Sequence, residues 1–233
     1  EESFDYFLQR PGLAFLDNED VHTIKCHSPY DYEDQVRYYQ LQGKSGQNRS
    51  LIADVIYECH ERYGKRIMAL FTSRQALNHV YHELMKKPLG RKLPVFAQVS
   101  GTSRYAMLKG MHRTINGILL GTNAFWEGVD LPRDLLEILI ISKLPFSVPT
   151  APRVQAYSNM LQQQGRNSFM EFSVPEAVIR FRQGFGRLIR TIEDAGLFIV
   201  MDERVVKKRY GSAFSDAIPA RMQTFNGIEE LIM

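Results

Sequence analysis

The stretch KRIMALFTSRQALNHVYHELMKK, residues 65–87, carries the pattern that decides the fold. Residues 65–73 form a short, nearly continuous apolar run, which is typical of a strand buried on both faces of a sheet. Residues 73–87 predict a helix, and Ser73 stands where a serine side chain can cap the helix N-terminus. The stretch therefore predicts a buried strand that leads directly into a helix.

The same alternation of strand and helix extends in both directions from this stretch. Further strands are expected at 93–101, 116–122, 136–146 and 196–202. Further helices are expected at 50–64, 103–113, 152–164 and 174–191. Strands that are apolar throughout and alternate with helices favour a parallel sheet covered on both faces. The predicted fold class is α/β, with a doubly wound, mostly parallel sheet that follows about 45 irregular, tyrosine-rich residues.

Hydroxyl side chains follow three of the expected strands, twice together with an arginine. These residues are Thr72, Ser73 and Arg74, then Thr102, Ser103 and Arg104, and finally Thr122. Ligands of doubly wound sheets bind at the carboxyl ends of the strands. The two serines can cap the helices that follow them, and a helix N-terminus beside an arginine can also bind phosphate. The two interpretations are compatible, and two matching Thr-Ser-Arg ends could hold successive backbone phosphates.

QGFGRLIRT, residues 183–191, lies in an expected helix with four arginines and no acid between Ala177 and Ile192. A helical wheel separates an apolar side from a cationic side: Val178, Phe181, Phe185, Leu188 and Ile192 against Arg180, Gln183, Arg187 and Arg190. Like charges one turn apart repel, and each glycine within a helix costs about 1 kcal/mol relative to alanine. The pattern favours an anion-binding face over a merely solvated one, with Arg187 and Arg190 placed to hold one polyphosphate.

GILLGTNAFWEGVDLP, residues 117–132, is the second strong constellation. A buried strand delivers Glu127, Gly128 and Asp130 to the ligand edge of the sheet, next to Trp126, the only tryptophan. An aspartate can accept hydrogen bonds from ribose hydroxyls there, and a glycine allows a ligand to approach the backbone. For Trp126 alone, a packing role and a contact role both remain open.

Two other segments resemble nucleotide-binding motifs without meeting their requirements. In QGKSG, residues 42–46, Tyr38 stands where a phosphate-binding loop needs glycine. FIVMDER, residues 198–204, resembles a Walker B strand, but no phosphate loop precedes it. A capped turn at the end of a strand explains Asp202 and Glu203. We therefore expect no complete nucleotide site within the chain.

Composition and charge set broad limits on function. The chain has 233 residues and a net charge of +3, which permits an anionic partner without requiring one. Cys26 and Cys59 are too few to hold an iron–sulfur cluster or a structural zinc ion, and their scarcity favours a reducing, cytoplasmic location. The apolar run at 135–142 is too short to span a membrane, and no signal peptide is visible. Because the chain begins without methionine, we expect a part of a longer protein.

These motifs, taken in their order, resemble the second RecA-like motor domain of a superfamily 2 DNA helicase of the DinG/XPD-like group. ALFTS (69–73) is similar to motif IV, GTNAFWEGVDLP (121–132) to motif V, and QGFGRLIR (183–190) to motif VI. Three other segments are also similar to DinG-type sequence: SFDYFLQRPGL (3–13), SPYDYEDQ (28–35) and SKLPFSVPTAP (142–152). The resemblance covers nearly the whole chain, and motif VI together with this motif V is its most specific part.

The resemblance implies a role for each candidate residue. Arg187 and Arg190 would be arginine fingers on the γ-phosphate of ATP. Gln183 would face the same nucleotide. Nucleotide state would be coupled to DNA by Glu127, Gly128 and Asp130. The nucleic-acid contacts would come from Thr72, Ser73, Arg74, Thr102, Ser103, Arg104, Thr122 and Trp126.

The resemblance also implies partners and cofactors. ATP and Mg²⁺ would be bound mainly by a first motor domain outside this chain, as would any iron–sulfur cluster. Residues 1–45 would be a leading segment from that domain, and residues 46–233 the motor domain itself. Single-stranded DNA, traversed 5′ to 3′, would be the track, in a role such as DNA repair and with no membrane involved. This chain alone would hydrolyse no ATP. The alternatives are a non-catalytic nucleic-acid-binding module and, less favoured, a complete nucleotide-binding enzyme that uses GKSG.

Overall fold

A seven-stranded sheet forms the centre of the protein. The computed structural model describes residues 4, 6, 8, 16, 21–26, 28–43, 49–99, 102–126 and 136–231. Its strands, all parallel, are β1 (Val36–Leu41), β2 (Ile67–Leu70), β3 (Val95–Ala97), β4 (Ile118–Gly121), β5 (Ile138–Ile141), β6 (Gly196–Val200) and β7 (Met222–Phe225). Their order across the sheet is β3-β4-β2-β5-β6-β1-β7. The predicted fold class is confirmed.

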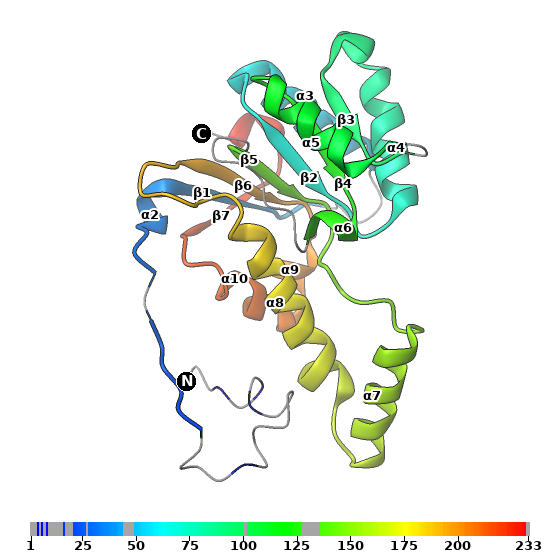
Figure 1. The fold of residues 1–233 in the computed structure, drawn as a ribbon, viewed down its shortest axis with the longest axis vertical. Helices are drawn as coiled ribbons and strands as arrows, with labels where there is room; N and C mark the ends of the chain where they lie inside the picture. The colour runs from blue at the N-terminus through cyan, green and yellow to red at the C-terminus, as the bar shows by residue number, and fades with distance from the viewer. Residues whose placement is uncertain are drawn as a thin grey trace.

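Helices cover both faces of the sheet (Figure 1). The α-helices are α2 (Tyr32–Gln35), α3 (Arg49–Tyr63), α4 (Arg74–Met85), α5 (Arg104–Arg113), α6 (Asn123–Trp126), α7 (Pro152–Gln163), α8 (Val174–Phe185), α9 (Arg204–Lys207) and α10 (Ser212–Ser215). Shorter turns are η2 (Gly90–Lys92), the π-turn η3 (Phe169–Ser173), η4 (Arg209–Gly211) and η5 (Ile228–Glu230). In the described part of the chain, no helix is long and apolar enough to cross a membrane.

Two hydrophobic cores result, one on each face. In β2, Met68 and Leu70 pack with α8 and α10, whereas Ile67 and Ala69 pack with α3 and α4. This division follows from the strand itself, because successive side chains point to opposite faces of a sheet. A strand buried on both sides must be apolar at every position, which is the pattern that the sequence showed. Figure 1 also shows α7 projecting away from the sheet.

Two strands, β1 and β7, were not predicted. β1 lies within the first 45 residues, which were expected to be irregular, yet it is paired on both sides, with β6 and with β7. Its sequence, VRYYQL, includes Gln40, which is fully buried and donates from Nε2 to the carbonyl oxygens of Leu41 and Asp202. A buried polar residue whose amide nitrogen donates to distant backbone interrupts the apolar pattern of a strand, so the pattern does not reveal it.

The predicted elements are otherwise present, although most are shorter than expected. The strand expected over 65–73 is ordered as β2 only from Ile67 to Leu70, because the residues after it turn toward α4. The strand expected over 136–146 is ordered as β5 only from Ile138 to Ile141, and the arginine helix α8 ends at Phe185 rather than near residue 191. The predicted N-caps are confirmed: Ser73 Oγ accepts from the Ala76 amide and Ser103 Oγ from the Ala106 amide, each at 3.2 Å.

Candidate nucleotide and nucleic-acid interface

The predicted phosphate-binding residues lie at one edge of the sheet. β3, β4 and β2 are neighbours, so the segments that follow them emerge side by side at the carboxyl edge. Ser73, Arg74 and the residues of the Thr102–Arg104 turn are exposed there, and Thr72 is half-buried. Both serine hydroxyls serve as helix caps by accepting, which leaves their protons available to donate to an anion.

Thr122 differs from these residues. It is 9% exposed, and its hydroxyl donates to Gln98 Oε1 at 2.6 Å, while its amide donates to the same oxygen at 3.1 Å. Because the hydroxyl proton is already used, donation to a phosphate would require this bond to break. Gln98, for which the sequence pattern gives no signal, holds the end of β4 against the end of β3.

Trp126 is a core residue in this structure. The residue is 2% exposed, and its Nε1 is 3.4 Å from the Phe71 carbonyl oxygen, to which it donates. A Cβ built on Gly184 would lie 3.1 Å from the indole ring, so a glycine in α8 allows the ring to approach. A buried ring offers no surface on which a base could stack. The position of Trp126 therefore favours packing over the predicted nucleic-acid contact.

Two arginines from different segments meet at α6. Arg187 Nη2 donates to the Trp126 carbonyl oxygen at 2.7 Å. From α5, the Arg104 guanidinium lies 5.7 Å from the centre of the Phe125 ring. Burial lowers the pKa of Arg187 first, and the charges of Arg190 and Arg104 lower it further. Arg190 and Arg104 therefore both contribute positive potential at Arg187, and positive charges attract an anionic ligand.

The wheel drawn for residues 174–192 is wrong beyond Phe185. Gly186 is the C-cap of α8, and the next residues form a tighter turn, with Arg187 bonded to the Gly184 carbonyl. Arg187 is only 8% exposed, and Ile192, which was placed on the apolar side, is 74% exposed. Helical periodicity cannot place side chains once the helix has ended.

Only part of the predicted cationic face is therefore formed. Gln183 lies on the exposed side of α8, and Arg190 is half-buried in the turn after it. Arg180 donates from Nη1 to Ser147 Oγ at 2.7 Å, so it serves the loop after β5 instead. Arg180 thus has a partner in the loop after β5, whereas Arg187 is bonded to α6.

The turn that contains Arg190 is held by an acid just outside the quoted motif. Asp194 Oδ2 accepts from the amides of Arg190 and Thr191, at 2.7 and 2.8 Å. Burial by itself raises the pKa of Asp194, but these hydrogen bonds and the charge of Arg190 lower it overall. The carboxylate therefore stays ionised at neutral pH and fixes the backbone on which Arg190 stands.

The N-terminal segment also braces this turn. The Tyr30 hydroxyl donates to the Arg190 carbonyl at 2.7 Å, and Gln35 Nε2 donates to the carbonyls of Thr191 and Asp194. The sequence signalled these residues only through the similarity of SPYDYEDQ to DinG-type sequence. In the structure, Tyr30 and Gln35 connect the segment before β1 to the arginine turn through these hydrogen bonds.

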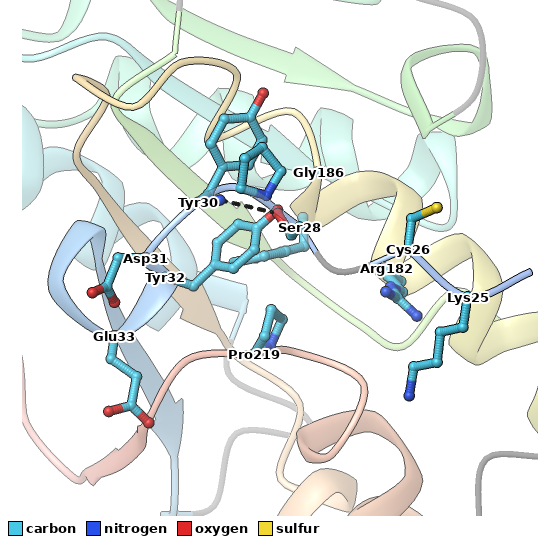
Figure 2. A pocket seen from close by; sticks show the side chains of 12 residues that line it. Lys25, Cys26, Ser28, Tyr30, Asp31, Tyr32, Glu33, Arg182, Gly186 and Pro219 are labelled. Carbon is cyan, nitrogen blue, oxygen red and sulfur yellow. Dashed lines mark hydrogen bonds between the residues drawn. The ribbon is translucent and has the colours of Figure 1, made fainter.

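A pocket of about 680 Å³ opens beside this brace, and Figure 2 shows the side chains of Tyr30, Tyr32 and Arg182 around it. Its lining consists of Lys25, Cys26, Ser28, Pro29, Tyr30, Asp31, Tyr32, Glu33, Arg182, Phe185, Gly186 and Pro219. Within it, the Tyr30 amide donates to Ser28 Oγ at 3.3 Å. Tyr30 belongs both to the pocket wall and to the contact with Arg190, so the pocket adjoins the candidate nucleotide-facing turn.

Some of the predicted residues lie outside the described ranges, whereas the structure describes the FIVMDER segment. Glu127, Gly128 and Asp130 lie outside the described residues, as does most of QGKSG. Asp202 is buried, accepts from the Leu144 amide at 2.9 Å and forms an ion pair with Arg204 at 2.6 Å. Its Oδ1 also accepts from the Arg204 amide. The interpretation of FIVMDER as a strand that ends in a capped turn is therefore confirmed.

Comparison with known proteins gives a consistent result. Over residues 56–221 the sequence matches the family of helicase C-terminal domains. The 3′-5′ exonuclease DinG of Bacillus subtilis is 35% identical over 227 residues, which cover 94% of this chain and 24% of that protein. The ATP-dependent DNA helicase DinG of Photobacterium profundum is 35% identical over 225 residues, 93% of this chain and 32% of that protein. The chain spans about a quarter to a third of the length of these relatives.

Solved structures share the fold at low sequence identity. S. tokodaii Xpd4 superposes with a TM-score of 0.56 and 17% identity, over 80% of this chain and 38% of that chain. S. cerevisiae Dbp5 bound to RNA and ADP BeF3 superposes with a TM-score of 0.57 and 13% identity, over 97% of this chain and 50% of that one. The matched family region contains β2 to β6, α6 and the arginine turn. The chain therefore belongs to the helicase C-terminal domain family, is similar to the DinG proteins over nearly its whole length, and has the α/β RecA-like fold of the second helicase domain that these solved structures contain.

Proposed function

We propose that this domain serves an ATP-dependent DNA helicase by supplying arginine fingers to ATP held on a first motor domain. The observation that carries the proposal is the convergence of Arg187 and Arg104 at α6. These arginines come from two motifs that are about 80 residues apart in the sequence. Arg187 was predicted to contact the nucleotide and Arg104 the nucleic acid. The place where they meet is therefore suited to coupling ATP binding to DNA binding.

The residues present fit a triphosphate. Arg190 and Arg104 both place positive charge near Arg187, and these charges lower its pKa in addition to burial. In the proposed mechanism Arg187 and Arg190 stabilise the charge that develops on the γ-phosphate, and Gln183 faces the same ligand. Hydrolysis of ATP supplies the free energy for movement along the strand. Mg²⁺ is assigned to the first motor domain together with the nucleotide.

Coupling runs through α6 in this proposal. Arg187 holds the Trp126 carbonyl, and the Trp126 indole is bonded to the Phe71 carbonyl just before Thr72 and Ser73. A shift of Arg187 toward a γ-phosphate would therefore displace a backbone group that is linked to the phosphate-binding end of β2. Glu127, Gly128 and Asp130, which follow α6 in the sequence, remain proposed members of this link.

The proposed track is single-stranded DNA. Ser73, Arg74 and the Thr102–Arg104 turn would hold its phosphates, because exposed hydroxyls and guanidiniums at helix N-termini bind phosphate oxygens. A relative named as an ATP-dependent DNA helicase supports DNA as the substrate. The 5′ to 3′ direction, a cytoplasmic location and a role in DNA repair are further parts of the proposal.

The finger assignment predicts a large and selective loss of activity. In the full-length protein, Arg187→Ala and Arg190→Ala are each expected to lower DNA-stimulated ATP turnover by about 10³-fold or more, while ATP binding is retained. Arg180→Ala is the matched control, because it removes an arginine of α8 that bonds Ser147 instead. Steady-state ATPase assays and binding of a fluorescent ATP analogue measure the two quantities. Wild-type turnover in both finger variants would disprove the assignment.

A non-catalytic nucleic-acid-binding module is the alternative. It requires the arginine segment to lie on the phosphate backbone, and the 8% exposure of Arg187 is unfavourable to that requirement. The two proposals differ in a simple measurement on this chain. If Arg187→Ala and Arg190→Ala abolish salt-dependent binding of single strands, the binding module is favoured. If the variants still bind single strands, the nucleotide-facing role is favoured.

A further inference from the structure

A cluster of aromatic rings lies beyond the end of β5 and outside the residues assigned above. The Phe146 ring is stacked on Phe169, with ring centres 5.6 Å apart and an interplanar angle of 21°. Tyr210 meets both rings edge-on, at 5.7 and 5.2 Å. Phe169 remains 41% exposed. One large aromatic ring is thus supported from beneath while part of its surface faces solvent.

Buried polar contacts fix this cluster from the ends of two strands. Asp202, after β6, accepts from the Leu144 amide at 2.9 Å and pairs with Arg204 at 2.6 Å. The Arg204 guanidinium in turn lies 5.3 Å from the centre of the Phe146 ring. The loop after β5 is therefore held to the segment after β6, and the rings on it are preorganised.

Basic residues precede Tyr210, which contacts the exposed ring. Residues 203–210, ERVVKKRY, carry four basic side chains and one carboxylate, and Glu203 pairs with Lys207 at 2.6 Å. Lys208 and Arg209 are exposed, and no carboxylate in the described ranges forms an ion pair with either. Lys143, in the loop after β5, is also exposed. Exposed aromatic surface beside uncompensated cations is the combination that binds single-stranded nucleic acids.

The cluster continues the row of strand ends already proposed to hold DNA. β5 and β6 follow β2 in the sheet order, and neighbouring strands are about 4.8 Å apart. The carboxyl ends of β3, β4, β2, β5 and β6 therefore form one continuous edge. A strand held at Ser103 and Ser73 would meet the segments after β5 and β6 next if it continued along this edge.

We infer that Phe169, supported by Phe146 and Tyr210, is a stacking platform for an unpaired base, and that Lys208 and Arg209 hold the adjacent phosphates. The inference rests on the proposed single-stranded DNA track and extends it by a site that recognises a base rather than the backbone. Stacking is tolerant of sequence, because every base has a π-face, so the platform would add affinity without selecting a sequence.

The base contact is tested by anisotropy with a fluorescein-labelled 20-nucleotide thymidine oligomer and the full-length protein without nucleotide. Phe169→Ala is expected to raise Kd about five- to a hundredfold, which is the usual effect of losing one stacked base. Phe169→Leu keeps the apolar bulk and should lose as much, whereas Phe169→Trp should bind like wild type. Ile115→Ala is the control, since Ile115 is 78% exposed before β4, at the opposite edge.

An abasic oligomer of the same length separates stacking from other effects. Without bases, wild type and Phe169→Ala should bind equally, because the platform has nothing to stack. Lys208→Gln combined with Arg209→Gln should reduce the slope of log K against log salt by about 1.4. The matched charge control is Arg91→Gln with Lys92→Gln, two exposed cations before β3, at the opposite edge.

Three results would contradict the stacking platform, and they differ in whether the proposed DNA track also fails. If wild type binds no oligomer, the proposed DNA track itself fails. If wild type binds and Phe169→Ala leaves Kd unchanged, only the platform fails. If Phe169→Ala changes ATP turnover while Kd stays the same, the aromatic surface docks another protein domain instead. Thermal unfolding of each variant confirms that it is folded.

Discussion

Arg187 occupies an unusual position for an arginine that is proposed to act on a nucleotide. It is 8% exposed, and its Nη2 is bonded to the Trp126 carbonyl. Burial and the neighbouring charges of Arg190 and Arg104 lower its pKa, yet a guanidinium remains protonated at neutral pH. Under the proposed function, this cation must leave the Trp126 carbonyl, or move α6 with it, when a γ-phosphate approaches.

The pKa of Asp202 is also lowered, but in an acid a lower pKa favours the charged form. The ionisation of Asp202 is therefore expected to contribute to stability. Burial by itself raises the pKa of Asp202, but the ion pair with Arg204 and the Leu144 amide lower it overall. A carboxyl group with a lowered pKa in the folded state stabilises the protein above its unfolded pKa of about 4. This contribution is lost as the pH falls through the lower, folded-state pKa.

Asp202→Asn is therefore expected to reduce the free energy of unfolding by about 1–3 kcal/mol at pH 7, because a buried charged acceptor is lost. The difference between wild type and variant should shrink below about pH 4. Urea unfolding at several pH values measures it. Glu203→Gln is the control, since the exposed pair with Lys207 is worth less than about 1 kcal/mol. An Asp202→Asn effect that stays constant with pH would contradict this account.

At the scale of elements, the end of α8 determines where the arginines stand. The helix packs Phe181 and Phe185 into the core and stops at Gly186, so the following residues leave the helical path. Its two glycines have different surroundings. A Cβ on Gly184 would lie 3.1 Å from the Trp126 ring, whereas a Cβ on Gly186 would approach only backbone carbonyls, the nearer being that of Arg182 at 3.5 Å.

These surroundings predict opposite effects of substitution. Gly184→Leu should reduce the free energy of unfolding by about 1–3 kcal/mol, because the side chain overpacks the contact with Trp126. Gly186→Ala should be neutral or raise stability by up to about 1 kcal/mol, since its backbone conformation suits alanine and the unfolded chain loses freedom. Urea denaturation compares them. Equal destabilisation by both would show that the helix end, rather than the ring contact, requires glycine.

At the scale of the whole molecule, the sheet begins before the expected domain boundary. β1 lies in the segment 1–45 and stands between β6 and β7. Among the described residues, β7 is an edge strand whose partner in the sheet is β1. The same N-terminal segment holds the arginine turn through Tyr30 and Gln35. The proposed leading segment and motor domain therefore share one core.

Truncation at two positions tests this organisation. A chain that begins at residue 46 loses β1, so it is expected to expose the edge of β6, to lose cooperative unfolding and to associate. A chain that begins at residue 28 keeps Tyr30, Gln35 and β1, and should unfold cooperatively. Thermal unfolding followed by circular dichroism, together with size-exclusion chromatography, distinguishes them. A well-folded monomer beginning at residue 46 would show that β1 is dispensable.

Much of this architecture followed from local sequence. Five strands are apolar on both faces, so their pattern alone predicted a covered parallel sheet, and Ser73 and Ser103 were identified as caps from their position. β1 was not predicted because the buried Gln40 interrupts its apolar pattern; the Gln40 Nε2 donates to the Asp202 carbonyl, 162 residues away in sequence. Short-range patterns contain no information about such a partner.

Local patterns were sufficient for the fold class, for the strand ends that carry hydroxyls and arginines, and for the family to which the motifs belong. Which of those residues come into contact depends on how the elements pack. In the folded chain Trp126 is buried against Gly184, Arg187 and Arg104 contact α6, and Arg180 is bonded to Ser147. The physical reason is that periodicity describes one element at a time. A site is made where elements pack, and its charges and hydrogen bonds depend on residues that are distant in the chain.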